Sequence, residues 1–376
     1  MWKKIKKPII CLAPMAGITD SAFRLICKEN GADMVYSEMA NVSALYYKPK
    51  KTLNLIKFSP KEKPYVVQLF GKNPQHFARA ANLISQRIPA INYQNKAISE
   101  KNKSGKISGI DINFGCPAKK VFSHGSGVFL MTKPKLSKKI IQAVVKNTHL
   151  PVSIKIRSGL EVPAHVKLKN SKKFIRSIDF LKKININNLG ISAIMIHGRT
   201  YRQGFSGPMD FKAVKEIKDY FKGIVIANGN ISNAAIAKET LEKTGSDGIG
   251  VATASRGNPE IFQQIQALKT KNNPPPVNQK IDWKQKFQIK SQNFLKQAYR
   301  AEKLKGKKGI IEQRKHFVWY FKGFPGIKKF IPQMVRIKNL KEIKKILNKI
   351  EESLAYSKLK KIDLKLKHFW NNIRSR

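Results

Sequence analysis

The stretch GIDINFGCPAKKV, residues 109–121, decides the fold of this chain. Gly109–Ile112 is a short apolar run of the kind that forms a buried strand. An asparagine, a glycine, a cysteine and a proline follow closely, and glycine and proline end strands. The stretch therefore predicts a buried strand that ends in a polar turn. Seven other runs share this pattern: Ile9–Leu12, Met34–Tyr36, Tyr65–Leu69, Val152–Ile156, Ala193–Ile196, Gly223–Ala227 and Gly248–Val251.

Amphipathic stretches separate these runs and predict helices: Pro74–Ile88, Leu136–Lys146, Phe211–Phe221 and Ala234–Lys243. Apolar strands that alternate with helices indicate parallel β-α-β units. Eight such units fill the ~250 residues of a closed (β/α)8 TIM barrel. An open, doubly wound sheet is the alternative, but no GxGxxG motif follows the first strand. We therefore predict an α/β fold built on a TIM barrel.

Two inserts interrupt the alternation of strands and helices. Asn92–Lys106 is rich in lysine and asparagine, which predicts a solvated loop on the far side of the barrel. Lys167–Asn188 carries apolar residues at Phe174, Ile178 and Leu181, which predicts a helix.

A stretch with three consecutive prolines, KNNPPPVNQK at 271–280, predicts a stiff linker after a barrel over residues 1–270. Beyond it, residues 281–376 are predicted to form a smaller, all-helical domain. One helix face there is apolar and consists of Ile343, Ile346, Leu347, Ile350 and Leu354.

The charge of the chain is strongly positive. Its 376 residues include 74 Lys+Arg and 23 Asp+Glu, a net charge of +51. This balance indicates a polyanionic partner, nucleic acid ahead of an anionic membrane, although a compositional bias toward lysine is an alternative source. Residues 281–376 alone carry 27 Lys+Arg and 7 Asp+Glu. The helical domain is therefore predicted to bind nucleic acid.

The chain is expected to be cytoplasmic. It has three cysteines, none in a CxxC pair, and no apolar run of the ~18–20 residues that cross a bilayer. The start, MWKKIKKPIICLAPMAG, has some character of a signal peptide, but Pro8 and Pro14 bracket its apolar part. A first buried strand is the preferred interpretation.

Functional residues of such barrels lie at the carboxyl ends of the strands. Here these ends contain no carboxylate pair, no His/Cys cluster with metal-ligand spacing, no GxSxG and no Walker lysine loop. Glycoside hydrolysis and a metal site are therefore not expected. The strand ends read APMAG (13–17), SEM (37–39), QLFG (68–71), DINFGCP (111–117), KIRSG (155–159), HGRT (197–200), NGN (228–230) and ATASRGNP (252–259).

Cys116 lies between Gly115 and Pro117, directly after a predicted strand. A buried structural cysteine is the simplest interpretation of its residue type. In the turn, the thiol can instead act as a nucleophile with a histidine partner, or as a proton donor. A thiol with an ordinary pKa of ~8.5 is mostly protonated at neutral pH.

Four further strand ends carry Gln68, Lys155, His197 and Asn228. Singly, a lysine that reaches solvent and a core histidine are common. Together they form a ring of donors and acceptors that suits a planar heterocycle, and NGN (228–230) lies where such barrels bind phosphate. The combination predicts a cofactor such as flavin mononucleotide (FMN).

At these residues the chain resembles the tRNA-dihydrouridine synthase family, most closely its bacterial B-type branch. The motifs are specific in combination and run in order along most of the chain. They are APMAGITD (13–20), QLFG (68–71), DINFGCPAKKV (111–121), IKIRSG (154–159), HGRT (197–200), NGN (228–230), GNPEIF (257–262) and RKHFVWYFKG (314–323).

The resemblance implies FMN-dependent reduction of specific uridines in tRNA to 5,6-dihydrouridine, with NADPH or NADH as reductant. tRNA is the implied partner and would lie across both domains; no metal is implied, and a monomer is expected. Cys116 is implied as the acid that protonates C5 after hydride reaches C6, and Asn113 and Arg199 as contacts to the target nucleotide. The implied flavin-binding residues are Pro14, Met15, Ala16, Gln68, Lys155, His197, Asn228, Gly229 and Asn230.

Two positions depart from the family pattern. Where the family has a Gly-Arg pair that grips the flavin phosphate, this chain has Ala252 and Thr253, and Arg256 is a candidate substitute. The family's Asn-Gly-Asp ends here in Asn230. Loss of one charged contact predicts phosphate binding that is weaker by ~1–3 kcal/mol.

Two other functions stay open. A flavin barrel that oxidises a free pyrimidine has no need of a basic helical domain. An RNA-binding scaffold or chaperone that has lost its flavin fits the missing Gly-Arg pair, but Cys116, Lys155 and His197 argue against it.

Overall fold

The computed structural model describes residues 1–86, 88–91, 104–164, 166, 173–269 and 282–356. The chain divides into two compact units. The first comprises Met1–Ser255 and Pro259–Pro276, and the second comprises Arg256–Asn258 and Val277–Arg376. The predicted linker, residues 271–280, lies outside the described residues.

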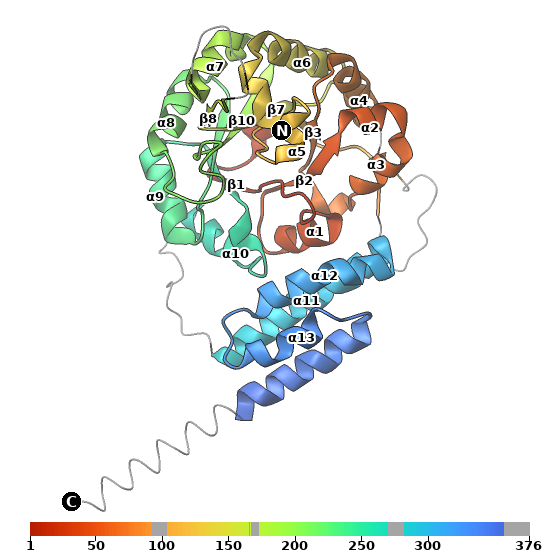
Figure 1. Ribbon diagram of the computed structural model, residues 1–376. Helices are drawn as coiled ribbons and strands as arrows, with labels where there is room; N and C mark the ends of the chain where they lie inside the picture. The colour runs from red at the N-terminus through yellow and green to blue at the C-terminus, as the bar shows by residue number, and fades with distance from the viewer. Residues whose placement is uncertain (87, 92–103, 165, 167–172, 270–281, 357–376) are drawn as a thin grey trace, which may run out of the picture. The chain divides into compact units, whose positions relative to one another are not determined.

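The first unit is a closed barrel of eight parallel strands, which confirms the predicted TIM barrel. The order around the barrel is β1-β2-β3-β6-β7-β10-β11-β12, and β12 pairs with β1. Figure 1 shows the ring of helices around these strands. The strands are β1 (Ile9–Leu12), β2 (Met34–Asn41), β3 (Tyr65–Phe70), β6 (Gly109–Phe114), β7 (Val152–Arg157), β10 (Ile191–His197), β11 (Ile224–Asn228) and β12 (Gly248–Val251).

Helices follow the strands and cover the outside of the barrel (Figure 1). Alternate residues of each strand face these helices, and they form a large apolar core with them. The helices are α1 (Ser21–Glu29), α2 (Val42–Tyr47), α3 (Pro49–Leu55), α4 (Pro74–Gln86), α5 (Lys119–Ser123), α6 (Pro134–Lys146), α7 (Ser177–Ile184), α8 (Phe211–Tyr220), α9 (Ala234–Thr244) and α10 (Ile261–Gln266).

The other strand residues form a second, smaller apolar cluster, which includes Cys11, Tyr36, Met195 and Ile226. Cys11 and Tyr36 are fully buried in it. Toward the carboxyl ends of the strands the buried residues become polar, and this change positions the site described below.

Two short antiparallel strand pairs lie outside the barrel sheet. β8 (Gly159–Glu161) pairs with β9 (Phe174–Arg176), so the prediction of one helix over Lys167–Asn188 was wrong at Phe174–Arg176, and residues 167–172 lie outside the described residues. Phe174 is 44% exposed and lies on this strand rather than on a helix face. Gly159 permits the pairing, because a Cβ there would lie 2.4 Å from Cζ of Phe174.

The insert Asn92–Lys106 lies mostly outside the described residues. Its described end contains β5 (Ser104–Gly105), which pairs with β4 (Ile88–Pro89).

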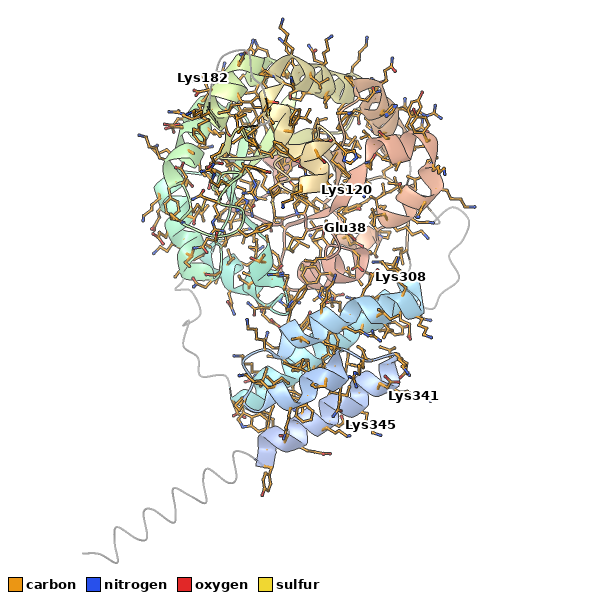
Figure 2. The ribbon with its side chains drawn as sticks, in the orientation of Figure 1. Glu38, Lys120, Lys182, Lys308, Lys341 and Lys345 are labelled. Carbon is orange, nitrogen blue, oxygen red and sulfur yellow. The ribbon has the colours of Figure 1, made fainter. Side chains whose placement is uncertain are left out.

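The second unit is helical in its described part. Phenylalanine rings dominate its core; those of Phe294 and Phe317 are stacked 4.5 Å apart. The helices are α11 (Trp283–Lys305), α12 (Lys307–Phe321), α13 (Ile331–Met334) and residues 340–356. The predicted apolar face over residues 343–354 is buried, whereas Lys308, Lys341 and Lys345, labelled in Figure 2, are exposed.

Candidate active site at the carboxyl end of the barrel

Neighbouring strands bring polar side chains together at the carboxyl end of the barrel. The register pairs Gln68 with Asp111 and Asp111 with Ser153. One level further along the strands, Asn113 pairs with Lys155. Because side chains two residues apart on a strand point to the same side, both levels face the same way. These strands therefore stack two polar layers.

Three side chains form a buried hydrogen-bonded chain that leads to the cysteine loop. Gln68 Nε2 donates to Asp111 Oδ2 at 2.7 Å, and Asn113 Nδ2 donates to Gln68 Oε1 at 2.9 Å. Asp111 Oδ1 also accepts a hydrogen bond from Ser153 Oγ at 2.6 Å. Burial raises the pKa of Asp111 to about 6, although the hydrogen bonds from Ser153 and Gln68 lower it. Because an ionised carboxylate can only accept hydrogen bonds, it fixes the orientation of the Gln68 amide and, through it, that of the Asn113 amide.

Cys116 is held through its backbone. Asn113 Oδ1 accepts hydrogen bonds from the N–H groups of Gly115 (3.1 Å) and Cys116 (2.9 Å). Arg157 Nε donates to the carbonyl of Gly115 at 2.9 Å. The Cys116 side chain is half-buried, and burial raises the pKa of its thiol. A hydrogen bond from Ala118 N–H and the charges of Arg157 and Lys155 oppose that rise. The thiol therefore stays protonated at neutral pH.

Lys155 is a half-buried cation at the carboxyl end of β7. Its Nζ donates to Asn228 Oδ1 at 3.1 Å, and Asn228 Nδ2 donates to the carbonyl of Gly250 at 2.7 Å. Burial and the charge of Arg157 lower the pKa of Lys155 to about 8, against the opposing effect of Asp111. An ammonium has three donors, and one hydrogen bond is described here for Lys155. An anionic or carbonyl-rich ligand such as a flavin ring fits this unsatisfied donor capacity.

His197 lies beside Lys155 at the end of β10 as a neutral imidazole. Burial lowers its pKa to about 2, with contributions from the charges of Lys155, Arg157 and Arg199. Its ring lies over Gly229, whose φ is +119° and where a Cβ would lie 2.7 Å from Cδ2 of His197. A side chain at position 229 would therefore displace the imidazole.

Arg199 and the Pro14–Ala16 loop lie at the ends of their strands. Arg199 is buried, and its Nε donates to the carbonyl of Gly207 at 2.8 Å. The Met15 N–H donates to Thr19 Oγ1 at 3.1 Å, which closes the loop after β1 into a turn. The Gly17 N–H donates to a carboxylate oxygen of Glu38. Figure 2 labels Glu38 together with Lys120 inside the ring of barrel helices.

The predicted phosphate positions have different surroundings. Ala252 is half-buried and Thr253 is exposed at the end of β12. Asn230 is exposed with φ at +56°, a conformation that asparagine tolerates. The Arg256 guanidinium lies 4.7 Å from the ring centre of Trp319 within the second unit. We therefore do not assign Arg256 to the phosphate.

Sequence reasoning missed three residues of this site: Asp111, Ser153 and Arg157. Arg157 also donates to the carbonyls of Thr200 (2.7 Å) and Gly204 (2.9 Å), so from the end of β7 it connects the loops that follow β6 and β10. The missed signal was spacing, because Asp111 precedes Asn113 by two residues and Arg157 follows Lys155 by two. Residues two apart on a strand share one face.

Within the described residues, no group of three or more His, Cys, Asp or Glu side chains could hold a metal ion. The helices that the structure describes include none long and apolar enough to span a membrane.

Comparison with known proteins supports one family. The family described as "Dihydrouridine synthase (Dus)" matches residues 11–355. The tRNA-dihydrouridine synthase B of Pasteurella multocida is 33% identical over 317 residues, which cover 84% of each chain. A probable tRNA-dihydrouridine synthase of Rickettsia conorii is 34% identical over 326 residues, or 85% of this chain and 86% of that one. The motifs, the barrel and these matches agree, and the chain belongs to the dihydrouridine synthase family.

Proposed function

We propose that this protein reduces selected uridines in tRNA to 5,6-dihydrouridine, with FMN as cofactor and NADPH or NADH as reductant. The observation that carries the proposal is the half-buried Cys116 thiol: Asn113 holds the backbone of this residue, and the charge of the half-buried Lys155 acts on its thiol. The names of the relatives support this reaction over others that a flavin barrel can perform.

Cys116 would act as the general acid. Addition of hydride at C6 of a uracil leaves negative charge at C5 and O4, and the product requires one proton at C5. Because burial raises the pKa of Cys116, the thiol carries that proton at neutral pH. Its partial exposure lets water return a proton to the thiolate after each turnover.

Lys155, His197, Asn228 and Gln68 would hold the cofactor. When bound, FMN supplies the hydride that adds to C6 of the uracil. The positive charge of Lys155 in a buried site favours electron-rich oxygen and nitrogen atoms next to it. His197 is neutral and adds a hydrogen-bonding group without a second charge.

Arg199 and Asn113 would orient the uracil. A uridine in folded tRNA is stacked on its neighbours, so it must be turned out to reach the site, at a cost of a few kcal/mol. Contacts between lysines and phosphates offset that cost, and the net charge of +51 supplies them. The proposal therefore includes steep dependence of tRNA binding on salt.

The test uses the full-length protein, FMN, NADPH and a tRNA transcript that carries no modified bases. We expect a flavin absorbance band in the protein and dihydrouridine in the digested tRNA by mass spectrometry of nucleosides. A protein that binds tRNA but cannot be reconstituted with flavin would support the scaffold alternative. If the protein turns over a free pyrimidine but forms no dihydrouridine in the tRNA, the result would support the alternative of a flavin enzyme that acts on free pyrimidines.

A further inference from the structure

Beside the site, α2 and the start of α4 carry a cluster of aromatic rings that the proposed chemistry does not use. The rings of Tyr46 and His76 are stacked with centres 4.3 Å apart. The ring of Tyr47 contacts both edge-on, at 4.8 Å from Tyr46 and 5.3 Å from His76. The Arg79 guanidinium lies 4.9 Å from the ring centre of Tyr46. We call Tyr46, Tyr47, His76 and Arg79 the aromatic platform.

The platform is fixed close to the mouth of the barrel. Asn41, the last residue of β2, caps α2 by accepting hydrogen bonds from Ser43 N–H and Ala44 N–H. Two residues earlier, Met39 lies 3.8 Å from Asn113 Nδ2 of the site. Ser43 Oγ lies 2.9 Å from Nδ1 of His76, which orients that ring. Figure 1 shows α2 and α4 as neighbours in the ring of helices.

Helix packing does not account for Tyr47. Val42 and Leu45 pack α2 against the core, and both are buried. Tyr47 is 70% exposed, so it adds little to the core. An aromatic ring that is open to solvent, in a cluster that also holds an arginine, is a surface on which unpaired nucleic-acid bases stack.

The charged residues of α2, α3 and α4 are all basic. Residues 42–61 contain five lysines and no Asp or Glu, and α4 contains Arg79 and no acidic residue. Next to Tyr47, a hollow of about 420 Å³ is lined by Lys48, Pro49, Lys50, Lys51 and Asn54. A surface of one sign complements a phosphate backbone. A protein partner would instead present acidic and basic side chains together.

We propose that the aromatic platform is a subsite for an unpaired base of the RNA substrate, with Lys50 and Lys51 on two adjacent phosphates. The inference rests on the proposed function, because it takes tRNA as the molecule bound at this mouth. Tyr47 is the ring left most open to receive the base. The subsite would hold the RNA while a different nucleotide enters the catalytic mouth.

The test measures tRNA binding by fluorescence anisotropy with full-length variants. Tyr47→Ala should weaken binding by at least about fivefold, the effect of losing one stacked base. Tyr47→Phe keeps the ring and should bind like the native protein. The double variant Lys50→Ala/Lys51→Ala should lower the slope of log Kd against log salt by about two.

Tyr220→Ala is the matched control. Lys182 Nζ lies 5.6 Å from the Tyr220 ring, a similar cation–aromatic pair, but Tyr220 is the last residue of α8 and Lys182 lies in the last turn of α7, and both helices return to the opposite end of the barrel. This variant should bind tRNA like the native protein. If Tyr47→Ala binds within twofold of native with an unchanged unfolding midpoint, the stacking subsite is refuted. If the native protein itself neither binds nor modifies tRNA, the proposed function fails instead.

Discussion

Asp111 gives the account of the buried network its sharpest test. Its pKa of about 6, against an ordinary value of 3.8, corresponds to roughly 3 kcal/mol of free energy. Since the folded pKa is raised, this stabilising contribution is complete below pH 3.8 and is lost as the pH rises through about 6. The native protein should therefore lose most of this, roughly 2 kcal/mol of stability, between pH 4 and 7.

Asp111→Asn removes the ionisable group and with it this part of the pH dependence. The assay is urea denaturation of both proteins at several pH values between 4 and 7, read by tryptophan fluorescence. The difference in unfolding free energy between native and variant should change by roughly 2 kcal/mol across this range. A constant difference would refute the reasoning.

The same variant also disturbs the cysteine loop. In Asp111→Asn, an N–H₂ donor replaces one of the two carboxylate oxygens. Ser153 and Gln68 each donate to one of these oxygens, so one of them loses its acceptor. A reversed Gln68 amide would then oppose the amide of Asn113. We expect dihydrouridine formation to fall about tenfold, the effect of ~1.4 kcal/mol, with FMN content unchanged. Ser153→Ala keeps the carboxylate and should raise the pKa of Asp111 further, which moves the loss of stability to higher pH.

Three further outcomes are expected. Because Lys155 loses its charge above pH about 8, FMN affinity should fall between pH 7 and 9. Lys155→Arg keeps the charge and should abolish that fall. If the native protein and the variant have the same pH profile, Lys155 does not bind the flavin. Arg24→Met leaves Glu62 buried without its partner at 2.6 Å, so the urea-unfolding free energy should drop by ~3–5 kcal/mol, and a loss under 1 kcal/mol would contradict this. Charge reversal of Lys308, Lys341 and Lys345 to glutamate should lower tRNA affinity and its salt slope, whereas an unchanged slope would place phosphate binding elsewhere.

The barrel could be predicted from sequence because each strand is a short apolar run bounded by turn residues. Ile9–Leu12 and Gly248–Val251 have the predicted bounds. The strand predicted as Met34–Tyr36 continues to Asn41 through Ser37 and Glu38, which are polar but buried. Their hydrogen bonds come from segments distant in sequence: Ser37 Oγ accepts from Gln68 N–H, and Glu38 accepts from Gly17 N–H. The periodicity of apolar residues in a sequence does not reveal such distant hydrogen-bond partners.

The site could be predicted in part for a related reason. The strand-end rule locates Cys116, Lys155 and His197 without knowledge of register. Asp111 was missed because its role depends on which residues lie opposite it, namely Gln68 and Ser153 on two other strands. Phe174 was assigned to a helix because its spacing to Ile178 is helical, whereas the absence of a side chain at Gly159 permits a strand pair there.

A single-turnover reaction of Cys116→Ala tests the central claim most directly. The protein is first reduced with NADPH, freed of excess reductant and mixed with unmodified tRNA, and dihydrouridine is followed over time. We expect the variant to have normal FMN content and tRNA affinity. Its dihydrouridine formation should be slower by at least the ~10²-fold that general acid catalysis contributes. Formation of dihydrouridine at the native rate would show that the proton at C5 comes from another group.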